Sequence, residues 1–129
     1  MDTIKEGYTT RKFDFPTKHY CQTLDLKDDP QLIKLYKKYH SEEESWPEIR
    51  EGIRSVGILE MEIYLINTRL FMIVETPLDF EWEEAFKRLA NMPRQAEWEE
   101  RMAVFQVADP SAGSSDKWQL MERIFRLYD

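Results

Sequence analysis

The first regular pattern of apolar and polar residues along the chain is a run of strand-forming residues at 19–26, which ends at a charged turn. Its composition and its boundary predict a β-strand. Asp29 and Pro30 then predict the start of a helix, because aspartate caps the free N–H groups of a first turn and proline suits its first position. Three residues of this helix repeat at helical spacing: Ile33, Tyr36 and His40.

The middle of the chain predicts a second helix followed by a β-hairpin. Pro47 begins this helix and Gly57 ends it, since glycine is the residue that most often follows a helix C-terminus. Two apolar runs follow, at 58–66 and 70–75. The short polar connection between them, residues 67–68, suits the turn of a hairpin.

The last third of the chain predicts two more helices and a final strand. Asp79 is expected to cap a helix that continues to about Ala90, and residues 91–93, which include a proline, break it. The next helix carries an apolar stripe: Trp98, Met102 and Phe105. Residues 109–116 contain proline, glycine and two serines, and they predict a loop. Residues 118–127 alternate well enough to predict the last strand.

The predicted order is strand, helices, strand, strand, helices, strand. Two β-α-β halves joined by a hairpin describe a ferredoxin-like α+β fold, in which an antiparallel sheet carries helices on one face. The other face also needs a cover, and a second subunit is the simplest one. We therefore expect a homodimer, with six apolar residues available to that face: Met61, Ile63, Phe71, Ile73, Met121 and Phe125.

The chain has 129 residues, the length of one domain. We expect that domain at 19–129, after an N-terminal extension at 1–18 that is either poorly ordered or covers a sheet edge. The extension is charged and has no apolar core, which is not the pattern of a secretory signal. Cys21 is the single cysteine and has no internal partner, so the sequence favours a reducing compartment, the cytoplasm.

Charge and hydropathy exclude two classes of partner. The net charge of −7 argues against nucleic acid, because phosphate binding needs a basic face. No apolar run approaches the roughly 20 residues that a membrane-spanning helix needs. The aromatic content of 13%, with four Trp and six Tyr, instead suits a sugar-lined pocket, since these rings are flat and can donate hydrogen bonds at their edges.

The sequence lacks the strong motifs of nucleotide, zinc and hydrolase sites. It has no glycine-rich phosphate loop, no paired-cysteine zinc pattern, no His-Glu-x-x-His and no Gly-x-Ser-x-Gly. Four glycines could hardly build a nucleotide cradle, and two histidines would leave a metal site dependent on carboxylates. We therefore expect neither a cofactor nor a metal.

The best candidate for proton transfer is the pair Tyr36 and His40. Residues four apart share a helix face, and a phenol beside an imidazole can donate and accept protons near neutral pH. On spacing alone, however, the favoured interpretation is that His40 merely ends the helix, where the helix dipole favours it.

Three further residues have a structural and a functional interpretation. Trp46 precedes Pro47 and is interpreted as packing under a loop, with a pocket wall as the less favoured alternative. Trp98 lies among glutamates, which fits an ordinary amphipathic helix and a sugar-stacking ring beside a carboxylate equally well. Glu75 ends an apolar strand as an edge charge or as a buried acid, and burial would indicate function.

A series of short motifs runs through the chain from about residue 20. Taken together, they resemble the L-rhamnose mutarotase family, with Tyr-x-x-x-His followed closely by Trp-Pro-Glu as a fairly specific part of the pattern. The resemblance covers most of the chain outside the first 18 residues and the loop at 109–116. The matching residues are Tyr36-Lys37-Lys38-Tyr39-His40, Trp46-Pro47-Glu48-Ile49, Gly57, Ile63-Tyr64, Leu70-Phe71-Met72-Ile73-Val74-Glu75, Trp98, Met102 and Met121-Glu122-Arg123-Ile124-Phe125.

The resemblance implies a dimeric ferredoxin-like α+β barrel that works without a cofactor. It implies an isomerase that interconverts the α and β anomers of a free 6-deoxyhexose, L-rhamnose first, as its small-molecule substrate. It also implies that His40 is the proton donor, that Tyr36 contacts the sugar, and that Trp98 is the first residue of a sugar-binding aromatic pair.

Two positions depart from the family pattern. Met61 stands where the enterobacterial type has a sugar-binding tyrosine, and Glu99 stands where it has the second tryptophan of the pair. Both remain candidate substrate contacts, but they make L-fucose, another 6-deoxy sugar, the alternative substrate.

The partner of His40 stays open at this point. Glu75, Glu99, Tyr36 or a bound water could be the base, and Tyr64 is a further candidate substrate contact. Two other functions share this architecture: a non-catalytic small-ligand-binding module and a monooxygenase-like enzyme. The monooxygenase is disfavoured because the matching residues belong to the sugar family, and fold alone does not separate the binding module from an enzyme.

Overall fold

The computed structural model describes residues 4–108 and 117–128, and its elements follow the predicted order. A single 3-10 turn, η1 (Ile4–Glu6), precedes them. The strands and helices are β1 (Thr17–Asp25), α1 (Pro30–Tyr39), α2 (Pro47–Ser55), β2 (Glu60–Ile66), β3 (Arg69–Pro77), α3 (Trp82–Leu89), α4 (Gln95–Ala103) and β4 (Gln119–Leu120).

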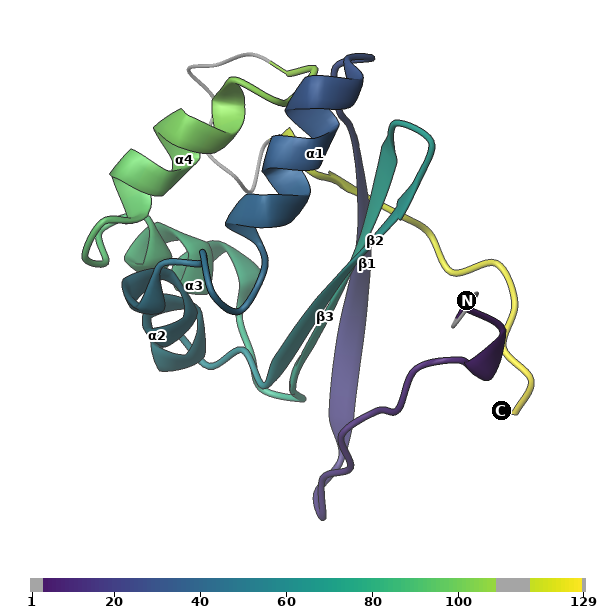
Figure 1. The fold of residues 1–129 in the computed structure, drawn as a ribbon. Helices are drawn as coiled ribbons and strands as arrows, with labels where there is room; N and C mark the ends of the chain where they lie inside the picture. The colour runs from purple at the N-terminus through teal and green to yellow at the C-terminus, as the bar shows by residue number, and fades with distance from the viewer. Residues whose placement is uncertain (1–3, 109–116, 129) are drawn as a thin grey trace.

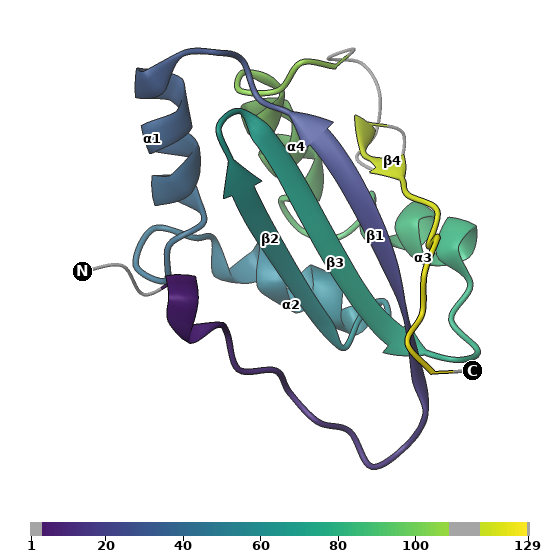
Figure 2. The ribbon, with the colours of Figure 1, turned by 90° about the vertical axis from the view of Figure 1, so that its right-hand side faces the viewer.

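The four strands form one antiparallel sheet in the order β2-β3-β1-β4. The long strands β3 and β1 occupy its centre, and the two β-α-β halves meet there, as in a ferredoxin-like fold. All four helices pack against the same face of the sheet, and the opposite face carries none of them (Figure 1, Figure 2). The predicted α+β fold is therefore confirmed.

Side chains alternate between the two faces along each strand, and the alternation decides what is buried. On β3 every second residue is between 0% and 7% exposed: Leu70, Met72, Val74 and Thr76. Leu24 and Gln22 of β1 lie opposite Leu70 and Met72, so they share the covered face. The helices close the core over these positions, mainly with Tyr36, Val56, Ala85, Leu89, Met102 and Phe105.

The same register corrects one expectation about the open face. Met61 and Ile63 were expected there, but Met61 pairs with Val74 and Ile63 with Met72, so both point toward the helices. Phe71 and the residue opposite it on β2, Tyr64, do face the open side. The expectation was wrong because a single-residue change of phase moves a strand residue to the other face, and hydrophobicity alone does not give that phase.

The helix starts follow the predicted chemistry at one site and depart from it at another. The Asp29 carboxylate accepts hydrogen bonds from the backbone N–H groups of Gln31 and Leu32, at 2.9 and 3.3 Å, and Pro30 begins α1 as predicted. Asp79, by contrast, does not cap α3. The Phe80 N–H bonds to the Pro77 carbonyl, so residues 77–80 form a turn and the helix begins only at Trp82.

The predicted last strand is much shorter than expected. Only Gln119 and Leu120 pair with β1, and the Met121 N–H bond to the Cys21 carbonyl ends the contact. Beyond it the chain leaves the sheet (Figure 1), and Ile124 and Phe125 are 89% and 75% exposed. A strand needs a partner for its backbone groups, and β1 supplies one only as far as residue 121.

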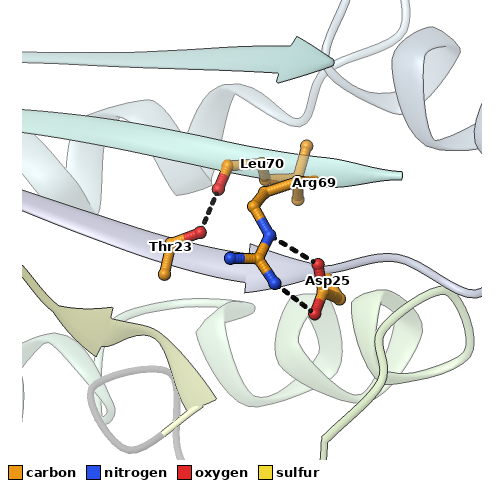
Figure 3. A network of polar contacts seen from close by, with 4 residues as sticks. All are labelled: Thr23, Asp25, Arg69 and Leu70. Atoms are coloured by element: carbon orange, nitrogen blue, oxygen red, sulfur yellow. Dashed lines mark hydrogen bonds and ion pairs between the residues drawn. The ribbon is translucent and has the colours of Figure 1, made fainter. Parts of the chain in front are cut away.

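A small polar network holds the hairpin end of the sheet in register (Figure 3). Arg69 binds both carboxylate oxygens of Asp25 at 3.0 Å, and the Thr23 hydroxyl donates to the Leu70 carbonyl at 2.9 Å. Both partners of the ion pair are about half exposed, so its contribution to stability is about 0–1 kcal/mol. Its role is to align β1 with β3.

The N-terminal segment lies on the helix-free side of the sheet (Figure 1), where the Tyr8 ring lies 5.6 Å from that of Tyr64. Over the described residues, none of the helices has the length and apolarity needed to cross a membrane.

Candidate active site

A cavity of about 380 Å³ lies between the covered face of the sheet and the helices. Its apolar wall consists largely of Trp46, Ile49, Met61, Ile63, Met72, Trp98, Met102 and Trp118. The polar side chains that border it include Gln22, Tyr36, His40, Gln95, Glu99, Gln106 and Lys117. A mostly apolar cleft with a few converging polar groups is the usual form of a small-molecule site.

His40 caps the C-terminus of α1, and its imidazole turns back along the helix. Its Nδ1 lies 2.8 Å from the backbone carbonyl oxygen of Tyr36. A carbonyl can only accept a hydrogen bond, so Nδ1 carries the proton and Nε2 presents a lone pair. The ring is held from two sides, by Tyr36 at 4.4 Å and by Trp98 at 5.3 Å between ring centroids.

Burial lowers the pKa of the His40 imidazole below its ordinary value of 6.5. The hydrogen bond from Nδ1 to the Tyr36 carbonyl opposes this shift, and the positive charge of Arg50 adds to it. The imidazole is therefore neutral at pH 7, with Nε2 ready to accept a proton. In this state the side chain can accept a proton at Nε2, and to act as the proton donor that the resemblance implies it must first gain one.

Tyr36 is 4% exposed, and burial raises the pKa of its phenol to about 12. The hydrogen bond from the Gln106 side chain lowers it only in part. The phenol thus keeps its proton at any physiological pH, and it serves as a hydrogen-bond donor and a packing group rather than as a base.

An aromatic wall stands beside His40. The Trp46 and Trp98 rings meet edge to face at 5.2 Å, and Tyr39 lies 6.3 Å from Trp98. The Arg94 guanidinium covers the Trp46 ring at 3.8 Å from its centroid, which fixes the ring by a cation–π contact. Trp46 is therefore a wall of the cavity, the interpretation that the sequence favoured less.

The two departures from the family pattern both border the cavity. Met61 projects from β2 into it, and Glu99 projects from α4, where its carboxylate accepts a hydrogen bond from the Gln95 amide at 3.3 Å. The structure thus brings together five of the predicted contacts: Tyr36, His40, Met61, Trp98 and Glu99.

Tyr64 and Glu75 are not brought to this cavity. Strand alternation places both on the open face of the sheet. There Glu75 accepts a hydrogen bond from the Thr17 hydroxyl at 2.6 Å, and the Tyr64 hydroxyl donates to Glu62 at 2.7 Å. Neither side chain can reach a molecule bound beside His40 from this position, so Glu75 is an edge charge rather than a buried acid.

Comparison with known proteins matches the same part of the chain. The family model described as L-rhamnose mutarotase matches residues 19–127. This range contains every element from β1 to β4, apart from the first two residues of β1. The chain belongs to the L-rhamnose mutarotase family.

Two relatives match most of the chain. The chain is 37% identical over 107 residues to an L-fucose mutarotase from Xanthomonas campestris pv. campestris, covering 83% of this chain and 86% of the relative. It is also 37% identical over 114 residues to a UPF0734 protein from Dictyostelium discoideum, covering 85% and 90% of the two chains.

A solved structure supports the mutarotase fold. The crystal structure of an L-rhamnose mutarotase from Formosa agariphila superposes with a TM-score of 0.63 at 18% identity, covering 86% of this chain and 99% of the other. At this identity the likeness concerns the fold alone.

Sequence reasoning missed several polar residues of this cavity, among them Gln22, Gln95, Gln106 and Lys117. One of them left a signal. Gln22 is in phase with Leu24 on β1, so it is a polar residue at a core position, and it is only 2% exposed. Lys117 and Gln106 lie outside any periodic pattern and left no such signal. Across residues 4–108 and 117–128, no three His, Cys, Asp or Glu side chains gather closely enough to hold a metal.

The lowered pKa of His40 predicts the acid side of the pH profile. As the pH falls below 6.5, an ordinary histidine becomes protonated, but His40 stays neutral until the pH reaches its lower pKa. Any activity that needs its free Nε2 should therefore persist below pH 6.5 and disappear only in more acidic buffer. The measurement is kcat/KM against pH, which reports the ionisation of the free enzyme. An acid limb centred at or above 6.5 would contradict the neutral, buried imidazole.

Proposed function

We propose that this protein interconverts the α and β anomers of a free 6-deoxy-L-hexose by acid–base-assisted opening and closing of the ring. The observation that carries the proposal is the free Nε2 of a neutral, partly buried His40 in a cavity walled by tryptophan rings. Membership of the mutarotase family supports the reaction type. The cavity volume of about 380 Å³ falls in the range of small-ligand sites.

Ring opening needs one proton to be removed and one to be supplied. In the proposed mechanism, His40 Nε2 takes the proton of the anomeric hydroxyl, the C1–O1 bond becomes a carbonyl, and the C1–O5 bond breaks while O5 gains a proton. Rotation about C1–C2 then presents the other face of the aldehyde to the O5 hydroxyl. On closure the imidazolium returns its proton to O1, so His40 is the base of one half-reaction and the acid of the other. One positioned proton-transfer group typically contributes about 10²–10⁴-fold.

The ring and the methyl group of a 6-deoxy sugar suit the mixed lining of the cavity. The less polar face of a pyranose can lie against the Trp46 and Trp98 rings, and the methyl group can contact side chains such as Met61 and Ile63.

Two carboxamides would receive the hydroxyl groups of the sugar. The Oε1 atoms of Gln95 and Gln106 are buried and accept no hydrogen bond from any described residue. Rotation about the last torsion of a glutamine side chain has a low barrier, so either oxygen can turn toward a bound hydroxyl. An unsatisfied buried acceptor costs about 1–3 kcal/mol, which a correctly placed hydroxyl would recover.

L-Rhamnose is the first candidate substrate, and L-fucose is the second because a relative 37% identical to this chain is an L-fucose mutarotase. The two sugars share the methyl group and differ in the orientation of ring hydroxyls, so polar contacts must separate them. Met61 cannot donate a hydrogen bond where a tyrosine would, and Glu99 accepts where a tryptophan can only donate.

We expect the protein to accelerate anomer exchange of both sugars, at rates that differ by at least about tenfold, because one lost hydrogen bond in a buried site costs about 1–3 kcal/mol. Saturation-transfer NMR on L-rhamnose and L-fucose at matched concentrations measures both rates. Equal rates would show that Met61 and Glu99 do not select the sugar. Binding without exchange would favour the non-catalytic ligand-binding module.

The open face of the sheet supports a homodimer as the working form. Phe71 and Ile73 lie on this face, and the segment beyond β4 exposes further apolar side chains, including Ile124 and Phe125. Exposed apolar groups that are this concentrated usually contact a partner. We expect light scattering at micromolar concentration to give twice the mass of one chain, and a well-behaved monomer would refute this proposal.

A further inference from the structure

Lys117 is a buried lysine at the edge of the cavity. It is 7% exposed and precedes β4. Trp118, the next residue, is 6% exposed and belongs to the core, and Gln119 then pairs with Thr23. The backbone around Lys117 is therefore anchored on both the core and the sheet, and the side chain borders the same cavity as His40.

The ammonium group of Lys117 makes no hydrogen bond or ion pair with any residue in the described part of the chain. Lysine is almost never buried to this extent without a partner, because removing an ammonium group from water costs several kcal/mol unless other groups replace the water. An ammonium has three N–H donors and no acceptor. Nζ is not among the fully buried side-chain atoms that lack a partner, so water reaches it, and a molecule that brings oxygen acceptors into the cavity can replace that water.

The fold places Lys117 at the Tyr36 end of the cavity. Strand β4 runs antiparallel to β1, with Gln22 opposite Leu120 and Thr23 opposite Gln119. Lys117 comes before β4, so it lies toward the C-terminal end of β1. There Leu26 bridges to Gln106. The Gln106 side chain in turn bonds to the Tyr36 hydroxyl, and the Tyr36 ring stacks on His40. Lys117 and His40 thus border one cavity with Tyr36 and Gln106 beside them.

We propose that Lys117 is the second acid–base residue of this site, and that its Nζ supplies the proton to the ring oxygen that His40 cannot supply. This inference rests on the proposed mutarotase function. His40 Nε2 binds the anomeric hydroxyl, and Lys117 Nζ binds O5 of the same sugar.

The two residues complete a balanced reaction. On opening, the O1 proton moves to His40, and the electron pair of the O1–H bond forms the C1=O1 double bond. The C1–O5 bond breaks, its electron pair stays on O5, and O5 takes a proton from Lys117. The products are the open aldehyde, an imidazolium and a neutral amine. On closing, the amine takes the proton back from the O5 hydroxyl as O5 attacks C1, and the imidazolium protonates O1. Neither residue is changed after one cycle.

The phenol and amide donors at this site are poorer acids. The phenol of Tyr36, with its pKa raised to about 12, gives up a proton less readily than an ordinary tyrosine. The amides of Gln22, Gln95 and Gln106 can donate hydrogen bonds but do not release protons near neutral pH.

The test compares Lys117→Met and Lys117→Arg with the wild type in the saturation-transfer assay. Methionine keeps much of the side-chain volume without the charge. We expect kcat to fall about 10²–10⁴-fold with little change in KM, while the melting temperature changes little, because the ammonium has no partner in the described residues to lose. Arginine keeps the positive charge, but its guanidinium is too basic to release a proton, so kcat should fall for this variant too.

The matched control is Lys87→Met. Lys87 is an exposed lysine on α3 outside the cavity, so this substitution should leave kcat unchanged.

The outcomes separate this inference from the proposed function. If the wild type does not exchange anomers of any 6-deoxyhexose tested, the proposed function fails. If the wild type exchanges them and either folded variant keeps wild-type kcat, the proton-donor role of Lys117 is overturned. Activity kept by arginine and lost by methionine would mean that only the charge matters. Should the methionine variant not fold, the arginine variant alone decides between these outcomes.

Discussion

Replacing His40 by glutamine is expected to reduce the acceleration of anomer exchange by about 10²–10⁴-fold, the usual contribution of one proton-transfer group. Glutamine is chosen because its amide can still donate to the Tyr36 carbonyl, the contact that His40 makes at 2.8 Å. It has no nitrogen that accepts a proton near neutral pH. The fold should persist, since the helix end keeps its hydrogen bond and a buried imidazole has been replaced by a group of similar size.

The other histidine of the chain provides the control. His19 is exposed on the open face of β1, away from the cavity, and His19→Gln should leave exchange unchanged. Circular dichroism and thermal melting of both variants check that the fold is intact. A folded His40→Gln protein that exchanges anomers at the wild-type rate would remove His40 from the mechanism.

Trp98→Ala is expected to weaken substrate binding, with kcat/KM reduced by about 10- to 100-fold and most of the change in KM. The Trp98 ring borders the cavity and contacts Trp46, His40 and Tyr39. An aromatic contact contributes about 0.5–1.5 kcal/mol in addition to the free energy of burying its apolar area. The substitution removes both contributions, which accounts for the expected fall in kcat/KM. The measurement is the dependence of the exchange rate on sugar concentration.

Trp82→Ala is the matched control for this truncation. Trp82 packs against Tyr20 and Phe86, at 4.5 and 4.3 Å between ring centroids, and does not border the cavity. We expect it to lower thermal stability, as Trp98→Ala also should, but to leave KM for the folded protein near the wild-type value. An unchanged KM in Trp98→Ala would show that the sugar does not contact this ring.

The sequence predicted the fold because the elements are marked by local chemistry. Asp29 and Pro30 begin α1 as capping rules require, and the hairpin turn forms at Asn67, which adopts the left-handed conformation with φ of 53°. The last strand was overestimated because its alternation is real but only Gln119 and Leu120 pair with β1. Local patterns report a preference, whereas a strand forms only where another strand pairs with it.

The cavity was predicted less completely, for two physical reasons. Which face of a strand points inward depends on register, and this placed Met61 in the cavity but left Tyr64 and Glu75 outside it. Residues such as Gln106 and Lys117 reach the site from irregular segments, where no periodicity links sequence position to direction. Tyr36 and His40 were found because a helix fixes the relative direction of residues four apart.

The direction of proton transfer at His40 needed the structure. The sequence places an imidazole at a helix end, where the dipole alone would favour its charged form. Burial and the charge of Arg50 lower the pKa instead, and the bond to the Tyr36 carbonyl fixes which nitrogen is free. These are tertiary effects, and they make the neutral imidazole the proton acceptor in the first step of the proposed mechanism.

The most direct test of the central claim is saturation transfer between the H1 signals of the α and β anomers of L-rhamnose and L-fucose, with and without the wild-type protein. The account predicts that irradiating one anomer attenuates the signal of the other for at least one of these sugars in the presence of the protein, and that the His40→Gln protein at equal concentration leaves only the buffer rate. Exchange at the buffer rate for both sugars with folded wild-type protein would contradict it.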